Sequence, residues 1–520
     1  MTGSSADCGG DSVERVDGVE SLPGTVLPDD LLPLTPAQRG MWFAENLSPD
    51  YSVNIAQYVD IQHAPGGFDD RLFTEICELV GKQIQSPYVR ITEVDGVPMQ
   101  YVDLDFDQHS QIIDLREDAD PVAAAMTWME AEYRRPVDLI TDQFIVLILL
   151  RVADDRVFWY MRSHHIIVDG YAALSILRRI VDHYNAVRRG EQVVDVKPAA
   201  TMAEIVDYEN SYVTGTRRTT DREHWLERVQ NLPERVTLSH VPTTAPLSFD
   251  NVVVSQALDA SLQARLEATA KECRSSMAVV LTAAFSAFLG RMSGTDDIVM
   301  SLPVTGRSTA KIKRSGGMVS NILPIRLRDV SAQTVRELIG SAQLEMTGAL
   351  RHQRYRSEDI KRDAGMDGSS FGFGPRINMV FFDEPIAIDG AEVTYRILTS
   401  GILDDLLVNL YQSSPGAPLV VDLHGNPHLY TRVEIESHHR RFLAFVERML
   451  NDLDAGVRDI ELLLPGEAAD LTALQTGPVR AWDERSACDT DLLALFRARV
   501  AEHPDRVAIT DDTAEWTYAE

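Results

Sequence analysis

The stretch Ser163-His164-His165-Ile166-Ile167-Val168-Asp169-Gly170-Tyr171 decides the fold of this chain, because it joins two patterns of different period. Before it, apolar residues fill 144–152 and 157–161 with a polar turn at 154–156 between them, which predicts a β-hairpin. After it, apolar residues recur near the helical period of 3.6, at Ala173, Leu177, Ile180, Tyr184 and Val187. Both histidines therefore lie where a strand ends and a helix begins, a rigid place from which a side chain can face a cavity.

A histidine pair in this place has more than one interpretation. A histidine near a strand end is most often an ordinary core or surface residue. The pair and the Asp four residues after its second member could also bind a metal ion. However, no further cysteine, histidine or carboxylate cluster stands at ligand spacing, so the sequence does not favour a metal site. A catalytic histidine is the third interpretation, and it depends on the rest of the chain.

The whole string, His-His-x-x-x-Asp-Gly after an apolar strand, resembles the signature of condensation domains of nonribosomal peptide synthetases. Acyltransferases of the chloramphenicol acetyltransferase type share this signature. Further motifs of the same family are matched in order by 34–43, 316–326, 352–360, 374–383 and 463–467. The last three are similar to the variant found in siderophore synthetases of the enterobactin type. One stretch departs from the family: 83–91 keeps only Arg90 of the second motif, which leaves the packing there open.

The resemblance implies an α/β fold with two chloramphenicol acetyltransferase-like lobes in a V, each a mixed β-sheet flanked by helices. We expect the first lobe over residues 29–240 and the second over 241–465, because periodicity is lost and two prolines occur at 242–248. An almost wholly apolar stretch at 277–292 predicts a buried helix in the second lobe.

The two ends of the chain differ from the lobes in composition. Residues 1–28 are rich in Gly, Ser and Asp and are predicted to be a disordered leader. Residues 466–520 are predicted to be a linker and the truncated start of an adenylation domain. This prediction depends on 491–520, which resembles the opening of such a domain but lacks its phosphate-binding loop.

The composition of the chain limits which molecules it is expected to bind and in which cellular compartment it is expected to lie. The 520 residues include 49 Lys and Arg against 79 Asp and Glu, a net charge of −30. Such a surface repels nucleic acid and anionic membranes, so neither is an expected partner. The N-terminus lacks the basic and apolar segments of a signal peptide, and the four cysteines show no paired spacing. We therefore expect a cytoplasmic protein with reduced thiols.

The resemblance also implies a reaction. Its substrates would be carried on phosphopantetheine arms, one on an upstream donor peptidyl carrier protein and one on the carrier after the adenylation domain of the same synthetase. The amine of the downstream aminoacyl thioester would attack the upstream acyl or peptidyl thioester and form an amide. His165 is expected to accept a proton from that amine, or to hold the amine near the carbonyl. The domain itself would bind no cofactor and no metal.

Neighbouring residues receive supporting roles. Side chains alternate along a strand, so His164 points away from His165 and is expected to be structural. Asp169 could orient His165 as a triad carboxylate does, but the family pairs this Asp with an Arg of the second lobe, here Arg307. Gly170 could let the backbone approach the thioester and offer its N–H to the oxyanion. The candidate tunnel or substrate-lining residues are Asn321, Asn378 and Tyr171.

Two other functions share parts of this pattern. An epimerisation domain has the same histidine motif, but it normally follows a carrier, whereas residues 491–520 resemble the start of an adenylation domain. A non-catalytic platform that only recruits carriers usually loses the histidine pair, which this chain keeps. Heterocyclisation is disfavoured because that branch replaces the pair with Asp. The sequence favours an amide-forming condensation domain.

Overall fold

The computed structural model describes residues 30–47, 53–108, 111–191, 198–241, 246–366, 372–381, 386–399, 401–476, 492–511 and 513–520. The leader predicted at residues 1–28 lies outside these ranges. The chain divides into two units, Met1–Leu462 and Leu463–Glu520, and each is described by itself.

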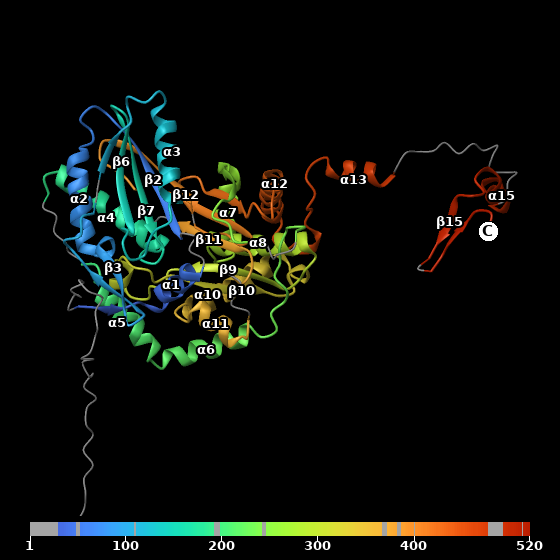
Figure 1. The fold of residues 1–520 in the computed structure, drawn as a ribbon, viewed down its shortest axis with the longest axis horizontal. Helices are drawn as coiled ribbons and strands as arrows, with labels where there is room; N and C mark the ends of the chain where they lie inside the picture. Colours follow the sequence, from blue (N-terminus) through green and yellow to red (C-terminus); the bar gives the residue numbers. More distant parts are fainter. Residues whose placement is uncertain are drawn as a thin grey trace, which may run out of the picture. The chain divides into compact units, whose positions relative to one another are not determined.

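The first lobe of the larger unit is built on a five-stranded mixed sheet in the order β12-β2-β7-β6-β5 (Figure 1). The hairpin predicted by the apolar runs is present as β6 and β7, paired antiparallel. One face of the sheet packs with α2 and α4 into the main core of the lobe, and α3 covers the other face. The elements are β2 (Asn54–His63), β5 (Gln111–Asp114), β6 (Ile145–Ala153), β7 (Arg156–His164), β12 (Ala391–Thr399), α2 (Asp70–Ile84), α3 (Pro121–Arg134) and α4 (Gly170–Arg188).

The second lobe is built on a six-stranded mixed sheet in the order β10-β9-β11-β13-β14-β8. Strand β11 runs parallel to both of its neighbours, whereas the other pairs are antiparallel. The predicted apolar helix is α8, whose central turns are buried between the sheet and other helices. The elements are β8 (Val252–Ala257), β9 (Ile298–Val304), β10 (Asn321–Leu327), β11 (Arg376–Phe381), β13 (Leu406–Gln412), β14 (Val420–Gly425), α7 (Ala260–Glu272), α8 (Met277–Ser293), α10 (Val335–Arg351) and α12 (Arg432–Met449).

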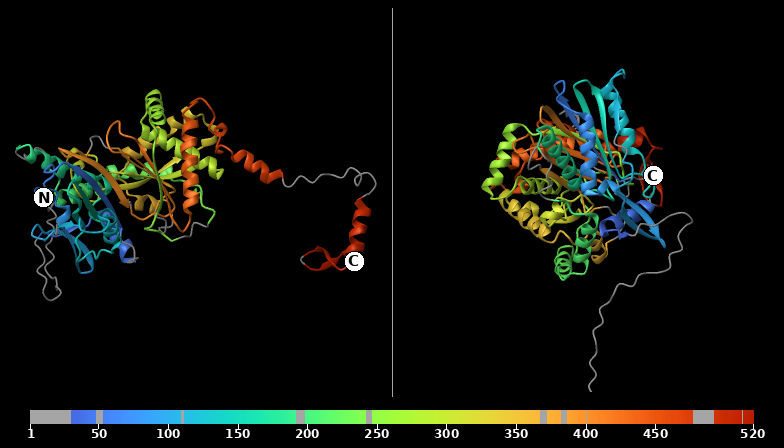
Figure 2. Two further views of the ribbon diagram at one scale, coloured as in Figure 1. Left: turned by 90° about the horizontal axis from the view of Figure 1, so that it is seen from above. Right: turned by 90° about the vertical axis from the view of Figure 1, so that its left-hand side faces the viewer.

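One strand crosses from the second lobe into the sheet of the first. β12 follows β11 in sequence, but it pairs antiparallel with β2 of the first lobe, with Tyr395 opposite Val59. Figure 2 shows this orange strand beside the blue β2. The sheet of the first lobe therefore contains residues from the range that the sequence assigned to the second lobe. The chain therefore passes from the sheet of the second lobe to that of the first at β12, and returns to the second at β13.

The remaining elements are shorter, and some of them belong to the smaller unit. A three-stranded antiparallel sheet, β1-β4-β3, lies in the first lobe, and the smaller unit contains one antiparallel strand pair. The elements are β1 (Leu32–Pro33), β3 (Val89–Val94), β4 (Val97–Val102), α1 (Pro36–Leu47), α5 (Met202–Val213), α6 (Arg217–Arg228), α9 (Ala310–Lys313), α11 (Ser357–Asp363), α13 (Glu467–Thr476), α15 (Leu492–Glu502), β15 (Val507–Thr510) and β16 (Glu515–Thr517), with 3-10 turns at Ser86–Tyr88, Val330–Ala332 and Val457–Asp459.

No single helix within the described ranges is long and apolar enough to cross a membrane. Helices α7 and α8 meet the length and composition test only as a pair, and they are bent by 103° at the break between them.

Candidate functional site

His165 is the first residue beyond β7, in the turn that leads into α4. Its backbone N–H donates to the carbonyl oxygen of Val53 at 3.0 Å, which fixes the turn against the strand segment before β2. The side chain is mostly buried and its Nδ1 atom is enclosed, so Nε2 is the nitrogen left to meet a substrate. Gly401, with φ of +85°, passes the ring, and a side chain there would begin 3.8 Å from His165 Cδ2.

Burial sets the protonation state of His165. It lowers the pKa of this imidazole from 6.5 to about 4, while the nearby Asp169 carboxylate opposes the shift. The ring is therefore neutral at neutral pH, because its pKa lies well below that pH. A neutral imidazole can accept a proton or a hydrogen bond from an amine.

His164 points to the opposite side and is fully buried. Its Nδ1 accepts the N–H of Ile166 at 3.3 Å, so the ring proton lies on Nε2, which donates to Glu45 at 2.7 Å. The same Glu45 oxygen accepts the N–H of Val53 at 3.2 Å. Glu45 therefore holds His164 and, through Val53, the backbone of His165. No motif in the sequence pointed to Glu45, which lies on α1 two residues after the motif at 34–43.

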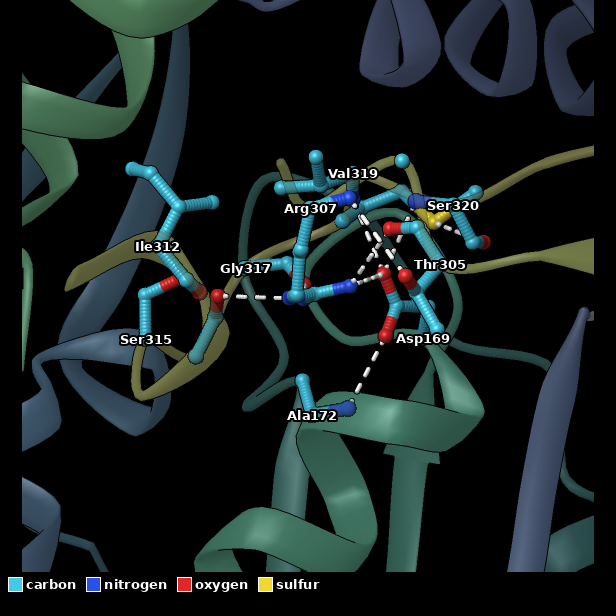
Figure 3. Close-up of polar contacts among 12 residues, drawn as sticks. Asp169, Ala172, Thr305, Arg307, Ile312, Ser315, Gly317, Val319 and Ser320 are labelled. Atoms are coloured by element: carbon cyan, nitrogen blue, oxygen red, sulfur yellow. Dashed lines mark hydrogen bonds and ion pairs between the residues drawn. The ribbon is translucent and has the colours of Figure 1, made fainter. Parts of the chain in front are cut away.

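Asp169 is buried beneath Arg307 (Figure 3). Its Oδ2 accepts from Arg307 Nη1 at 2.7 Å and from the backbone N–H groups of Val319 and Ser320 at 3.0 and 2.9 Å. Its Oδ1 accepts a backbone N–H at 2.9 Å and caps the first turn of α4. Burial alone would raise the pKa of Asp169, but Arg307 and these N–H groups hold that pKa below its ordinary value. The carboxylate ties the histidine motif to a loop of the second lobe.

Arg307 completes this tie from the second lobe. Its Nη2 donates to the carbonyl oxygen of Gly317 at 3.0 Å, and its Nη1 also donates to that of Thr305 at 3.0 Å. The aromatic ring of Tyr171 lies 5.1 Å from the centre of the guanidinium group, within cation–π range. Tyr171 is partly exposed, at the second residue of α4. Gly170 before it is also exposed, and outside the neighbouring backbone no described atom lies within 4 Å of where its Cβ would stand.

Asn321, a candidate lining residue, is buried at the start of β10. Its Nδ2 donates to the carbonyl oxygens of Gln353 at 3.0 Å and Tyr355 at 2.7 Å. Its Oδ1 accepts the N–H of Ser357 at 3.0 Å. The amide thus holds the family motif at 352–360 against β10, and these bonds leave no side-chain group of Asn321 for a substrate.

The degenerate second motif at 83–91 joins the lobes. Arg90 donates to the carbonyl oxygens of residues 140–142 at 2.6 to 2.9 Å and so braces the loop before β6. Ser86 is buried, and its Oγ accepts the N–H of Gly317 at 3.0 Å. A Cβ added to the neighbouring Gly316 would overlap Ser86 Oγ. The motif therefore supports the loop that holds Arg307.

Gly316→Ala is expected to destabilise the protein by about 1–3 kcal/mol, the cost of overpacking in a closed core. Thermal melts followed by circular dichroism measure the effect. Ser86→Ala removes the overlapping oxygen and leaves Ser86 Cβ 3.0 Å from the new methyl group, so the double variant should melt above Gly316→Ala alone. If the melting-temperature change of the double variant equals the sum of the changes of Gly316→Ala and Ser86→Ala, the two side chains do not overlap as expected.

Asn378 lies on β11 and donates from Nδ2 to Asn409 Oδ1 of β13 at 2.9 Å. Arg376, two residues earlier, is buried, and its charge acts on His165 and on His424 of β14. The sequence did not point to Asn409 and His424, because they belong to no motif and lie near the site only through the pairing of β11, β13 and β14. Within the described ranges, no group of three or more His, Cys, Asp or Glu side chains is placed to hold a metal ion.

A family model described as Condensation domain matches residues 29–472. A dimodular nonribosomal peptide synthase of Bacillus subtilis is 30% identical over 490 residues, which are 93% of this chain and 20% of that protein. Enterobactin synthase component F of Escherichia coli is 30% identical over 504 residues, 94% of this chain and 37% of that protein. The chain thus spans well under half the length of these curated relatives.

Solved structures agree with the family model. A variant of the starter condensation domain of rhizomide synthetase, in complex with C8-CoA, has a TM-score of 0.77 and 30% identity, over 83% of this chain and 98% of that one. The first condensation domain of the calcium-dependent antibiotic synthetase, in complex with a substrate analogue, has a TM-score of 0.75 and 26% identity, over 84% of this chain and 100% of that one.

Fold, site and relatives together define an amide-bond-forming acyltransferase. The chain belongs to the condensation-domain family of nonribosomal peptide synthetases, and some of its relatives are siderophore synthetases. The α/β fold class predicted from the sequence is confirmed. Neither an epimerisation domain nor a docking platform is favoured, since the structural neighbours are condensation domains.

Proposed function

We propose that His165 holds the amine of a downstream aminoacyl thioester and accepts its proton as that amine attacks an upstream acyl thioester. The supporting observation is the neutral, mostly buried imidazole, fixed at the end of β7 by the Val53 carbonyl and opposite Gly401. In this reaction the C–N bond of the amide forms and the C–S bond of the donor breaks. The proton taken by His165 Nε2 passes to the departing thiolate, so the ring ends the cycle neutral.

The other site residues take positions around this step. Asp169 and Arg307 hold the loops of the two lobes together, and His164 with Glu45 holds the backbone of His165. Gly170 is the candidate backbone donor for the oxyanion, since the space beside it is open and the N-terminus of α4 favours negative charge.

The substrates proposed here are thioesters on phosphopantetheine arms. The donor is an acyl or aryl group on an upstream carrier protein, by analogy with the enterobactin-type relatives and with the C8-CoA complex of a starter condensation domain. The acceptor carrier would follow the adenylation domain whose opening we assign to residues 491–520. Because such carriers are loaded inside cells, the proposal also places the reaction in the cytoplasm.

The 520-residue protein should form an amide from an acyl-loaded donor carrier and an aminoacyl-loaded acceptor carrier, with mass spectrometry of the released product as the measurement. Incubation in deuterated water separates the alternatives. Exchange of the α-hydrogen without amide formation would indicate an epimerisation domain. Carrier binding with neither reaction would indicate a docking platform, and either result would contradict the proposal.

A further inference from the structure

A row of polar side chains crosses the sheet of the second lobe. Sheet pairing places Asn378 of β11 opposite Asn409 of β13, Asn409 opposite Asp422 of β14, and Asp422 opposite Ser255 of β8. Asn378 donates to Asn409, and Asn409 Nδ2 lies 3.5 Å from Asp422 Oδ2, the outer limit of a hydrogen bond. Asn409 and Asp422 are buried, whereas Asn378 is half-buried and Ser255, on the edge strand, is exposed. Burying the two central polar groups costs free energy unless they are hydrogen-bonded.

This row faces the first lobe and not the helices of the second. Side chains alternate along a strand, and Ile377, Val408 and Leu423 on the opposite face belong to the core of the second lobe. Val380, on the same face of β11 as Asn378, packs against the core of the first lobe. The row therefore lies at the junction that contains His165.

His424 extends the polar surface by one position. It lies two residues after Asp422 on β14, so its ring projects from the same face. Leu407 separates it from Arg376 across β13. Arg376 acts electrostatically on both His424 and His165, which indicates that the three share one region. Burial and this cation lower the pKa of His424 to about 4, so its ring is neutral at neutral pH.

Three buried atoms of this surface have no hydrogen-bond partner in the part of the chain that the structure describes: Asp422 Oδ1 and both ring nitrogens of His424. Both residues are more than nine-tenths buried, and His424 Nε2 lies 4.0 Å from Asp422 Oδ2, too far for a hydrogen bond. Buried polar atoms are almost always paired, and each exception requires an explanation. These three atoms are therefore candidates to bind a ligand.

We propose that Asp422 and His424 bind a hydroxyl group of the substrate, with Asn378 and Asn409 holding Asp422 in place. The hydroxyl would donate to Asp422 Oδ1 and accept from the N–H of the neutral His424 ring. An ammonium group suits the site less well, because Arg376 adds positive charge and a neutral imidazole with one N–H also offers a donor. The hydroxyl can belong to the donor acyl group or to the acceptor side chain. This inference rests on the proposed function.

The test compares matched substrates that differ by one hydroxyl. N-acetylcysteamine thioesters of serine and alanine supply the acceptor pair, and those of 3-hydroxyoctanoic and octanoic acid supply the donor pair. We expect kcat/KM to favour the hydroxyl form at least tenfold in one pair, which identifies the source. Asp422→Ala should reduce that preference to within about twofold of unity. A ratio near unity for both pairs in the wild type would overturn the inference.

Binding to the His165→Ala variant makes the test independent of turnover. Calorimetry should show the same preference for the hydroxyl form of the identified pair, because that variant keeps the polar surface. If no amide forms from any pair but the binding preference is present, the proposed function fails and the hydroxyl site stands. If amide forms from every pair without preference, only the hydroxyl site fails.

Thermal stability provides a second readout. Asp422→Asn should leave the melting temperature unchanged or raise it, because a buried carboxylate with an unpaired oxygen is unfavourable in the free protein. Val421→Ala, on the same strand but on the core face, is the matched control: it should lower the melting temperature and keep the hydroxyl preference. A lower melting temperature for Asp422→Asn with an unchanged preference would show that the row is structural.

Discussion

Amide formation is expected to fall by about 10²–10⁴-fold when His165 is replaced by Ala, the usual range for loss of a general base. The variant should fold, since the backbone bond of residue 165 to Val53 remains. Product is measured by mass spectrometry under single-turnover conditions with saturating thioesters. His428→Ala, an exposed histidine of the second lobe, is the control and should retain full activity. Unchanged product formation by His165→Ala would refute the proposed role.

His165→Gln and the pH dependence distinguish the two roles of the ring. Gln can hold an amine but cannot take its proton, so activity well above that of His165→Ala would indicate positioning. In the wild type, the acceptor amine loses reactivity below its pKa of about 7.7–8.0. Because burial places the pKa of His165 at about 4, log(kcat/KM) should fall with a slope of one between pH 6.5 and 5. A slope of two in that range would contradict a neutral, buried His165.

Arg307→Met should lower the free energy of unfolding by about 3–5 kcal/mol, since it leaves the buried Asp169 carboxylate without its cation. The change also releases the carbonyl oxygens of Thr305 and Gly317 from their donor. Urea denaturation followed by tryptophan fluorescence measures the loss. Amide formation should fall as well, because the loop from the second lobe no longer holds the turn that follows His165.

A double-mutant cycle tests whether this cost comes from the uncompensated charge. Asp169→Asn keeps an oxygen to cap α4 and removes the charge. Arg307→Met combined with Asp169→Asn should therefore cost less than the sum of the single variants. Arg116→Met, which removes a cation from an exposed ion pair with Asp114 and Asp154, should leave the transition unchanged. Additive costs in the cycle would mean that the two residues act independently.

Local patterns predicted the elements that carry the motif. The apolar runs at 144–152 and 157–161 form the β6–β7 hairpin, and the stretch at 277–292 forms the buried helix α8. In both cases a continuous apolar run with polar or turn residues beside it marks the element, so a short window of sequence contains the necessary information. The family resemblance added the partner of Asp169, and Arg307 lies 2.7 Å from it although 138 residues separate them.

The sequence did not predict that β12 crosses between the lobes, nor did it predict the partner of His164. By its position in the sequence, β12 belongs to the second lobe. Only its pairing with β2 places it in the sheet of the first lobe. Glu45 stands 119 residues before His164, in a helix whose pattern gives no sign of a buried carboxylate. Asp422 and His424 likewise look like ordinary strand residues. Whether these two side chains can form a binding site depends on which strands lie beside β14.

By itself, the sequence determined the class of this protein and its hairpin and helix at the histidine motif, and it supplied His165 as the residue proposed to react. Periodicity and motif order are properties of neighbouring residues, so they can be read without a structure. The tertiary structure alone decided that the His165 ring is buried and neutral, that Glu45 and Ser86 support the site, and that a polar row faces it. Burial and pairing depend on residues far apart in the chain, and these meet only when the two lobes and their shared strand assemble.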